Sequence, residues 1–284
     1  MRKIVITAAI LLVFLVGLSI LLYPYVASYI NSLRQSRVVA QYYRDLQTLT
    51  EEDFIELFDA AHEYNARLTG NRNRYILNDE EMEEYLGLLN PFGNGIMGTL
   101  LISKINVRLP IYHGTNEGVL RIGAGHLEGT SLPVGGLGTH TVVTGHRGLP
   151  SATLLTELGR MEIGDTFQLN ILNEVLTYKV DQIKVVEPHE MNDLAFDKDR
   201  DFCTLVTCTP YGINSHRMLV RGSRVSNTEA VVYSPNAEQL GIQTEAYEVD
   251  SLLVVGLLLI PPVIIVAFYL TFSIKRLKRR RRTR

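Results

Sequence analysis

The sequence is poor in cysteine. Its two cysteines in 284 residues, Cys203 and Cys208, are too few for a disulfide scaffold or for a zinc site with four cysteine ligands. If the segment between them is a strand, their Cα atoms lie about 16 Å apart, whereas a disulfide needs less than about 7 Å. Both thiols are therefore expected to be free, and a free thiol outside a cell needs a reason.

Several common enzyme motifs are also absent. The chain has no P-loop, no GxGxxG after a strand, no GxSxG and no HExxH. His140 and His146 are six residues apart, and no cluster of cysteine and histidine ligands accompanies them. The sequence therefore disfavours a metal enzyme, and neither a metal nor another cofactor is expected.

Two long runs contain no charged residue, Ile4–Asn31 and Ser251–Ile274. Each reaches the roughly 20 residues that a helix needs to cross the core of a bilayer. The first run is longer than the apolar part of a signal peptide, which has about 7–15 residues. An uncleaved anchor is therefore favoured over a cleaved signal peptide. We expect two transmembrane helices, the second kinked at Pro261 and Pro262.

Basic residues flank these two runs. Arg2 and Lys3 precede the first, and the tail Lys275–Arg284 holds eight basic residues and no acidic one. The positive-inside rule then predicts a two-pass protein of the cell membrane, with both termini in the cytoplasm and the rest outside. Without these ten basic residues the chain has 18 basic and 30 acidic residues, a net charge of −12. This acidic exterior argues against a nucleic-acid partner, and the tail is expected to bind anionic lipid.

A helical part precedes a strand-rich part between the two runs. Residues 37–68 have helical apolar spacing with a break expected at Thr50, and residues 78–89 form another helical candidate. The turn Asn90–Gly95 marks a boundary. Six segments after it have the composition of strands: 99–107, 139–145, 166–172, 176–187, 202–208 and 216–225. Strands this frequent predict a closed or nearly closed β-barrel, with short helical turns at residues 151–158 and 191–196.

Cys208 ends a predicted strand just before a turn at Pro210-Tyr211-Gly212. A thiol at a strand end can face a groove from a rigid support. Its thiolate is the reactive form, so a nearby imidazole or cation is needed to lower its pKa. From composition alone, the favoured explanation is that Cys208 is a buried small hydrophobe. Cys203 keeps that explanation, because strand alternation points it to the opposite face.

Seven histidines could supply the imidazole. His146 is the strongest candidate, because it follows a predicted strand and has glycines on both sides, which suit a crowded site. His140 begins the same strand and is expected to be structural. His113 and His126 in glycine-bounded loops stay open as alternatives. His62 and His189 are expected to be solvated.

Arg217 is the candidate cation, nine residues after Cys208. It returns towards the thiol if the strands on either side of the turn pair as a hairpin. A guanidinium there can donate two hydrogen bonds to a substrate carbonyl or a developing oxyanion. Arg221 carries the same charge but lies further along the strand, and position alone favours Arg217. His216 should face away from Arg217.

Four segments resemble the signature of class C sortases, which are pilin polymerases of Gram-positive bacteria. They are Leu109–Gly114, Gly125–Val134, Thr144–Pro150 and, above all, Thr204–Gly222 with its Thr-Leu-Val-Thr-Cys208-Thr-Pro-Tyr-Gly sequence. The resemblance runs from about residue 95 to 225. An N-terminal span and a basic-tailed C-terminal span also fit this family.

The resemblance implies a mainly β fold, an eight-stranded sortase β-barrel with N-terminal helices and two flanking transmembrane helices. It also implies a catalytic triad, which maps onto Cys208, His146 and Arg217. Cys208 would cleave the Thr–Gly bond of an LPXTG-like sorting signal and form a thioester. A lysine amine of another pilin subunit would resolve this thioester, with His146 as general acid and base and Arg217 as oxyanion stabiliser.

The resemblance has one departure. Class C sortases usually carry a lid with an Asp-Pro-aromatic motif over the active site, and no proline lies between Thr69 and Leu89 here. Asn90-Pro91-Phe92 is the nearest match, but it lacks the carboxylate and adjoins the barrel. We therefore expect closure of the site to be weaker or differently made.

The expected layout has six parts. They are a cytoplasmic N-terminus and transmembrane helix (1–33), a helical pre-barrel or lid-like segment (34–94), the catalytic barrel (95–226), a linker (227–250), a transmembrane helix (251–274) and a basic cytoplasmic tail (275–284). Three alternatives stay open: a sortase that anchors proteins to the cell wall, a plain cysteine protease, and a non-catalytic membrane-tethered assembly module.

Overall fold

The structure is a computed structural model that describes residues 2–68, 74–227, 264–272 and 275. Its contacts divide the chain into two compact units. One comprises residues 32–149 and 153–244, and the other comprises residues 1–31, 150–152 and 245–284. The first of these, here called the barrel unit, contains His146, Cys208 and Arg217.

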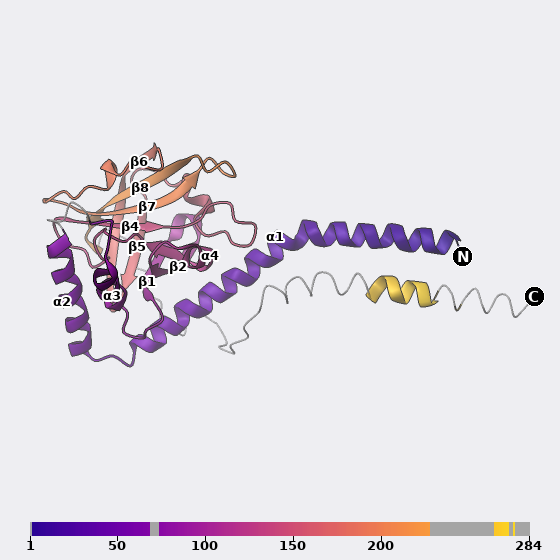
Figure 1. Cartoon of the computed structure of the whole chain (residues 1–284), viewed down its shortest axis with the longest axis horizontal. Helices are drawn as coiled ribbons and strands as arrows, with labels where there is room; N and C mark the ends of the chain where they lie inside the picture. The colour runs from indigo at the N-terminus through magenta and orange to yellow at the C-terminus, as the bar shows by residue number, and fades with distance from the viewer. Residues whose placement is uncertain (1, 69–73, 228–263, 273–274, 276–284) are drawn as a thin grey trace, which may run out of the picture. The chain divides into compact units, whose positions relative to one another are not determined.

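A closed β-barrel forms the centre of the barrel unit (Figure 1). Its eight strands follow the order β1-β2-β3-β4-β7-β8-β6-β5. Their bounds are β1 Ile96–Ile102, β2 Val107–His113, β3 Ala124–His126, β4 Thr139–Thr144, β5 Thr166–Ile171, β6 Glu174–Val186, β7 Asp201–Thr209 and β8 His216–Val225. The pairs β2–β3 and β4–β7 are parallel, and the other neighbours are antiparallel. The predicted eight-stranded barrel is confirmed.

One predicted strand is wrong in its bounds. Residues 99–107 do not form one strand, because β1 ends at Ile102 and a 3-10 turn, η1 (Ser103–Ile105), follows. Asn106 then takes a left-handed backbone conformation with φ 52°, and β2 begins at Val107. The predicted helical turns are present as shorter 3-10 helices, η2 (Thr156–Arg160) and η3 (Asn192–Leu194).

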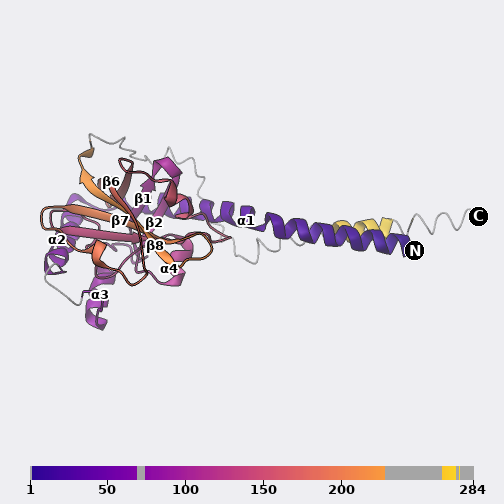
Figure 2. The same ribbon diagram turned by 90° about the horizontal axis from the view of Figure 1, so that it is seen from above.

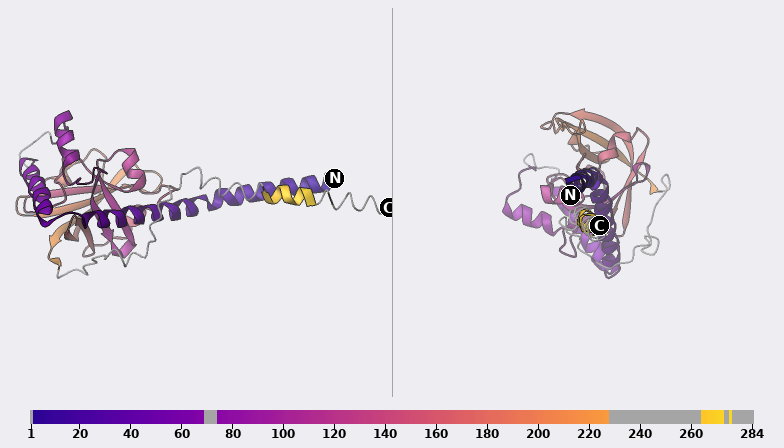
Figure 3. Two further views of the ribbon diagram at one scale, coloured as in Figure 1. Left: turned by 90° about the horizontal axis from the view of Figure 1, so that it is seen from below. Right: turned by 90° about the vertical axis from the view of Figure 1, so that its right-hand side faces the viewer.

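Three helices precede the barrel: α1 (Arg2–Leu46), α2 (Glu51–Leu68) and α3 (Asp79–Gly87). The predicted break at Thr50 is confirmed. Thr50 and Asp53 cap each other, since Asp53 N donates to Thr50 Oγ1 at 3.2 Å and Thr50 N donates to Asp53 Oδ2 at 2.7 Å. The helices α2 and α3 lie towards one end of the barrel and α4 (Glu117–Ile122) towards the other (Figures 1 and 2). The view from below in Figure 3 shows the same separation.

The last turns of α1 cover β1. Tyr42 Oη donates to Met97 O at 3.1 Å, and the hydroxyls of Tyr43 and Thr99 lie 3.0 Å apart. Because this helix covers its outer side, β1 is buried along its whole length and shows no hydrophobic–polar alternation. Burial also raises the pKa of Tyr42 above its usual value.

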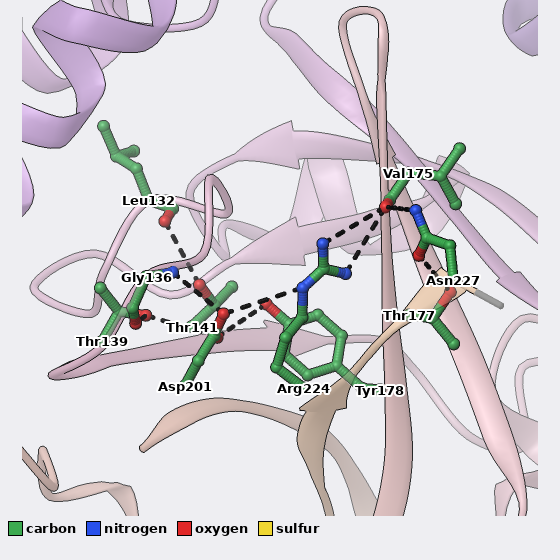
Figure 4. Close-up of polar contacts among 10 residues, drawn as sticks. All are labelled: Leu132, Gly136, Thr139, Thr141, Val175, Thr177, Tyr178, Asp201, Arg224 and Asn227. Atoms are coloured by element: carbon green, nitrogen blue, oxygen red, sulfur yellow. Dashed lines mark hydrogen bonds and ion pairs between the residues drawn. The ribbon is translucent and has the colours of Figure 1, made fainter. Parts of the chain in front are cut away.

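A buried polar cluster lies in the barrel unit where β7 begins (Figure 4). The carboxylate of Asp201 accepts hydrogen bonds from Gly136 N at 2.9 Å, Tyr178 Oη at 3.0 Å and Thr139 Oγ1 at 3.4 Å. Arg224 Nε lies 3.9 Å from the same carboxylate. Burial raises the pKa of Asp201, and these donors act against that rise. We call this group the Asp201 cluster.

One helix of the described residues is long and apolar enough to cross a membrane, Lys3–Leu46. It contains the first predicted span, and its length and composition suit membrane anchoring. Most of the second predicted span, 251–274, lies outside the described residues, as does the tail 276–284.

Candidate active site

Cys208 lies near the end of β7, in the middle of the barrel wall between β4 and β8. Strand alternation separates the two cysteines as expected. Cys203 is fully buried, and burial raises the pKa of its thiol well above the usual value, whereas Cys208 is partly exposed. The structure therefore leaves one thiol accessible, and it is the one at the strand end.

Arg217 is the direct cross-strand partner of Cys208 on β8. Directly opposed residues of an antiparallel pair have Cβ atoms about 4.5–5.5 Å apart, so the predicted hairpin places Arg217 directly beside Cys208. Arg217 Nη1 donates to the carbonyls of Asn214 at 3.3 Å and His216 at 3.1 Å. No ion pair involving Arg217 occurs among the described residues, which leaves its remaining N–H groups for a ligand.

His146 reaches the same end of the barrel from β4. The parallel register places Thr144 opposite Val206, and the pairing continues through Gly145 N, which donates to Val206 O at 3.0 Å. The next contact is Thr207 Oγ1 donating to Gly145 O at 2.8 Å. Parallel strands point the same way, so His146, two residues after the end of β4, and Cys208, near the end of β7, lie at the same end of the barrel.

A glycine at position 145 is required by close packing. An added Cβ there would lie 2.9 Å from two side-chain atoms of Leu155, which is closer than real Cβ atoms approach. The crowded glycine beside His146 that the sequence suggested is thus confirmed.

His146, Cys208 and Arg217 line one cavity of about 350 Å³. Its other lining is mostly apolar and includes a buried hydrophobic cluster, which we call the apolar floor: Val142, Val186, Leu194 and Leu219. Leu127, Met191 and Val206 pack against this cluster. The cavity therefore offers an apolar floor for aliphatic side chains with a thiol, an imidazole and a guanidinium at its edge.

Of the seven histidines, all within the described residues, only His146 lines this cavity. His140 is structural as expected, with Nδ1 2.9 Å from Ala195 O and Nε2 2.7 Å from Thr204 Oγ1. His62 and His189 are exposed as expected. The side chain of His216 lies on the far side from Arg217 by alternation and 3.6 Å from Glu187.

The two histidines left open by the sequence are held inside the fold. His126 is fully buried, with Nδ1 2.9 Å from Tyr85 Oη and Nε2 2.8 Å from Ser131 O. His113 has its two ring nitrogens 3.0 Å from Gly95 O and 2.7 Å from Leu88 O. Burial lowers the pKa of His126 to about 4 and lowers that of His113. Both are thus engaged away from the thiol.

Sequence reasoning missed a carboxylate beside His146. Glu117, in the first turn of α4, has Oε2 3.3 Å from His146 Nε2, and its Oε1 accepts from Arg121 Nε at 2.9 Å. Nothing in the local sequence marks this residue, because Glu117 lies 29 positions before His146 and on a helix that was not predicted. Only the tertiary fold joins them.

A second missed contact ties the two sides of the site together. Arg147 Nη1 donates to Thr209 Oγ1 at 3.2 Å, which links the loop after His146 to the strand end that carries Cys208. Its Nε is buried without a hydrogen-bond partner. Arg147 therefore connects the loop after β4 to the end of β7.

The segment before α3 contacts the loop that borders the cavity. The guanidinium of Arg74 stacks on Phe196 at 3.9 Å and donates to Leu194 O at 3.1 Å. Its main chain also lies against Gly129, where an added Cβ would be 2.1 Å from Arg74 O. Leu194 lines the cavity, so this contact joins the pre-barrel segment to one wall of the site.

No metal centre accompanies these residues in the part of the chain that the structure describes. No three histidine, cysteine, aspartate or glutamate side chains there lie where they could hold a metal ion together. The cavity instead brings together a thiol, an imidazole and a guanidinium.

Known proteins resemble this chain in sequence. Residues 100–225 match the family model described as Sortase domain. Over 132 residues the chain is 30% identical to sortase D of Bacillus subtilis (strain 168), a match that covers 45% of this chain and 64% of that protein. The chain therefore matches somewhat less than two thirds of the length of that relative.

Solved structures resemble it over more of their length. Sortase C1 from Streptococcus agalactiae is 44% identical with a TM-score of 0.66, and the match covers 67% of this chain and 99% of that one. A sortase C from Streptococcus pneumoniae, described in terms of catalysis and pilin substrate specificity, is 40% identical with a TM-score of 0.59, covering 66% and 96%. Each match thus covers nearly all of the solved structure and about two thirds of this chain.

Proposed function

The chain belongs to the sortase family, and on that premise we propose that it is a class C sortase, a cysteine transpeptidase that joins pilin subunits. The observation that carries this proposal is the single cavity shared by His146, Cys208 and Arg217. Each side chain arrives from a different strand end, and the barrel register brings them together.

In the first half-reaction, the Cys208 sulfur attacks the threonyl carbonyl carbon of an LPXTG-like sorting signal. His146 takes the thiol proton, and the tetrahedral intermediate collapses with cleavage of the Thr–Gly bond. His146 then gives the proton to the departing glycyl amine. The products are a thioester on Cys208 and the released C-terminal peptide.

In the second half-reaction, a lysine Nζ of another pilin subunit attacks the thioester carbon. The C–S bond breaks, an isopeptide bond forms, and the proton lost by the amine passes through His146 to the Cys208 sulfur. The enzyme returns to its starting state. No cofactor is needed, because the energy of the peptide bond is kept in the thioester and then in the isopeptide bond.

Arg217 stabilises the oxyanion of both tetrahedral intermediates. Its position opposite Cys208 and its free N–H groups suit donation to an oxygen on the carbon that the thiol attacks. The apolar floor with Val142, Leu194 and Leu219 suits the leucine and proline of the sorting signal. These side chains bind the signal while the polar edge performs the chemistry.

The test uses the full-length chain in detergent and mass spectrometry. An LPXTG peptide alone should give a thioester adduct on Cys208, and an added lysine peptide should convert it into an isopeptide-linked product. Cys208→Ala should give neither. Cleavage that survives in Cys208→Ala would overturn the proposal and favour a non-catalytic assembly module with a contaminating activity.

The same assay separates the remaining candidates. Resolution by water in preference to the lysine peptide would indicate a cysteine protease. Resolution by a cell-wall glycine or diamino-acid peptide in preference to the lysine peptide would indicate a cell-wall-anchoring sortase. The class C proposal requires the lysine of a pilin sequence to be the preferred acceptor.

We also propose the two-pass topology, with residues 34–250 outside the cell and both termini in the cytoplasm. The apolar helix of residues 3–46 supports the first anchor, and the charge bias of the sequence supports the orientation. Protease treatment of intact cells should remove epitopes placed in the linker 227–250 and spare epitopes at either terminus. Loss of a terminal epitope would contradict this topology.

A further inference from the structure

The short helix α4 is held firmly at the rim of the candidate site. Asn116 caps its start by accepting from Val119 N at 3.1 Å, and Gln35 Nε2 of α1 donates to Ile122 O at its end, at 3.2 Å. The strand that follows packs closely below it, since an added Cβ at Gly125 would lie 3.2 Å from both Val119 and Leu120. The side chains of α4 are therefore carried on a fixed support.

Glu117 is the α4 residue whose side chain contacts His146, whereas Leu120 of the same helix lines the cavity. One carboxylate oxygen lies 3.3 Å from His146 Nε2, and the other accepts from Arg121 Nε at 2.9 Å. An ionised carboxylate only accepts hydrogen bonds, so Nε2 of His146 must carry the proton in this contact. The other ring nitrogen, Nδ1, is then the one left to exchange a proton with a thiol or an amine.

The charged groups around His146 come from several elements. Cys208 on β7, Arg217 on β8 and Glu190 after β6 line the same cavity, and Arg147 is the next residue in the chain. Among the described residues, Glu117 is the carboxylate within hydrogen-bond distance of the imidazole.

We propose that Glu117 is a positioning residue for His146, and that Arg121 limits its effect by sharing the carboxylate. This inference rests on the proposed function, in which His146 becomes an imidazolium each time it accepts a proton from Cys208 or from the attacking amine. Glu117 holds the ring through Nε2–H and stabilises the imidazolium, so Nδ1 accepts and returns the proton. Glu117 itself is neither protonated nor bonded to substrate.

The sharing by Arg121 supplies two variants with opposite predictions. Glu117→Gln keeps the shape of the side chain and removes its charge, so the imidazolium of His146 loses stabilisation. Arg121→Gln removes the competing cation and leaves the whole carboxylate to His146. Arg121 has no other ion pair among the described residues, which makes it a matched control on the same helix face.

The experiment reads the tautomer of His146 by NMR in full-length protein that carries ¹³C,¹⁵N-labelled histidine, with His146→Asn used for assignment. Wild-type ¹⁵N shifts should report the Nε2–H tautomer, because the Glu117 carboxylate can only accept from that nitrogen. Glu117→Gln should weaken that preference, and Arg121→Gln, which leaves the whole carboxylate to His146, should strengthen it. Equal ¹⁵N shifts in the three proteins, or changes in one common direction, would overturn the inference.

Kinetics give an independent reading. Glu117→Gln should lower kcat for LPXTG-peptide cleavage about two- to fivefold, the effect expected of an exposed charge pair, and leave KM unchanged. A change confined to KM would contradict a role on His146. If wild-type protein formed no thioester while the NMR shifts were as expected, the proposed function would fail and the Glu117–His146 contact would stand.

Discussion

The two ends of strand β7 are built in opposite ways. At its start, the Asp201 carboxylate is buried and accepts three hydrogen bonds with an arginine close by (Figure 4). Near its end, Cys208 is partly exposed, and the hydrogen bonds that Arg217 makes within the described residues go to the carbonyls of Asn214 and His216. One strand of nine residues thus carries two kinds of polar group. At its start their hydrogen-bonding capacity is used within the fold, and near its end much of that capacity is left for a ligand.

This difference separates polar groups that stabilise the fold from those that act on a ligand. A buried polar group without a hydrogen-bond partner raises the free energy of the folded state, so the groups of the Asp201 cluster are bonded to one another. A group that must bind a transition state keeps its hydrogen-bonding capacity free until the ligand arrives. The comparison predicts that changes at Cys208 and Arg217 reduce activity and spare stability, and that changes at the Asp201 cluster do the reverse.

The largest effect is expected from Arg217→Ala. Loss of one oxyanion donor typically lowers kcat about 10²- to 10³-fold, and the unfolding midpoint of the protein should stay close to that of wild type. Arg217→Lys should recover only part of the activity, because an ammonium keeps the charge without the two-pronged donor geometry. The measurement is cleavage of an LPXTG peptide together with thermal unfolding.

Arg221→Ala is the matched control on the same strand. Arg221 donates to Asp181 at 2.9 Å and stacks on Phe202 at 4.2 Å, so its guanidinium, like the Asp201 cluster, is already bonded within the fold. We expect its loss to lower the unfolding midpoint and to leave cleavage near the wild-type rate. Equal losses of activity in the Arg217 and Arg221 variants would break the comparison between the two ends.

The second effect is a loss of stability in acid caused by the buried histidines. Burial lowers the pKa of His126 and of His140 to about 4, whereas the unfolded chain titrates near 6.5. Between these values the unfolded state binds more protons, so stability is complete above about pH 6.5 and falls as the pH drops towards 4. Each histidine should contribute about 3 kcal/mol to this loss.

Chemical denaturation of full-length protein at pH 7.5 and pH 4.5 measures it. His140→Gln should unfold more easily at pH 7.5 but lose less stability between the two pH values than wild type, because one titrating group is gone. His189→Gln, at an exposed site, should follow the wild-type curve. The same slope in His140→Gln and wild type would show that another group causes the loss.

The third effect is expected at the start of β7. Asp201→Ala leaves Tyr178 Oη and Gly136 N buried without their acceptor and Arg224 without its counter-charge, which should cost about 3 kcal/mol. Asp201→Asn keeps an acceptor and the volume, so its cost should be smaller. Asp199→Ala removes an exposed carboxylate two residues away and should change the free energy of unfolding by less than about 0.5 kcal/mol. The activity per folded molecule should be unchanged in all three variants.

Local pattern predicted much of this fold. The bounds of β8 agree with the predicted 216–225, and those of β4, β5 and β7 agree to within one residue at each end. The strands β2 and β3 were missed for physical reasons. Pro110 interrupts the pattern of β2, and β3 has only three residues between glycines and turns, too few for a period of two to be visible.

The candidate site was predictable where it depends on strand register and not where it depends on tertiary contact. Cys208 and Arg217 follow from a hairpin, and His146 from a strand end. Glu117 and Arg74 come from segments whose position relative to the barrel no local pattern specifies. The missing Asp-Pro-aromatic motif was visible in the sequence, but the contact between Arg74 and Phe196 was not.

The smallest effect is expected from Arg74→Ala, on the rate at which a thiol reagent modifies Cys208. This variant tests what limits access to the end of β7 that carries Cys208. In wild type, a methanethiosulfonate reagent should modify Cys208 rapidly, and Cys203 should not react because it is fully buried. Arg74→Ala removes the stack on Phe196 and the hydrogen bond to Leu194 O, so the loop bordering the cavity is less firmly held. The rate of Cys208 modification should rise about two- to fivefold, in line with a cation–π contact of about 0.5–1 kcal/mol.

The control is Arg67→Ala, which breaks an ion pair with Glu84 away from that loop and should leave the rate of Cys208 modification unchanged. Slow modification in wild type, at a rate typical of sortases with an Asp-Pro lid, would show that the site is closed by other means, and equal rates in the Arg74 and Arg67 variants would show that Arg74 has no part in closure.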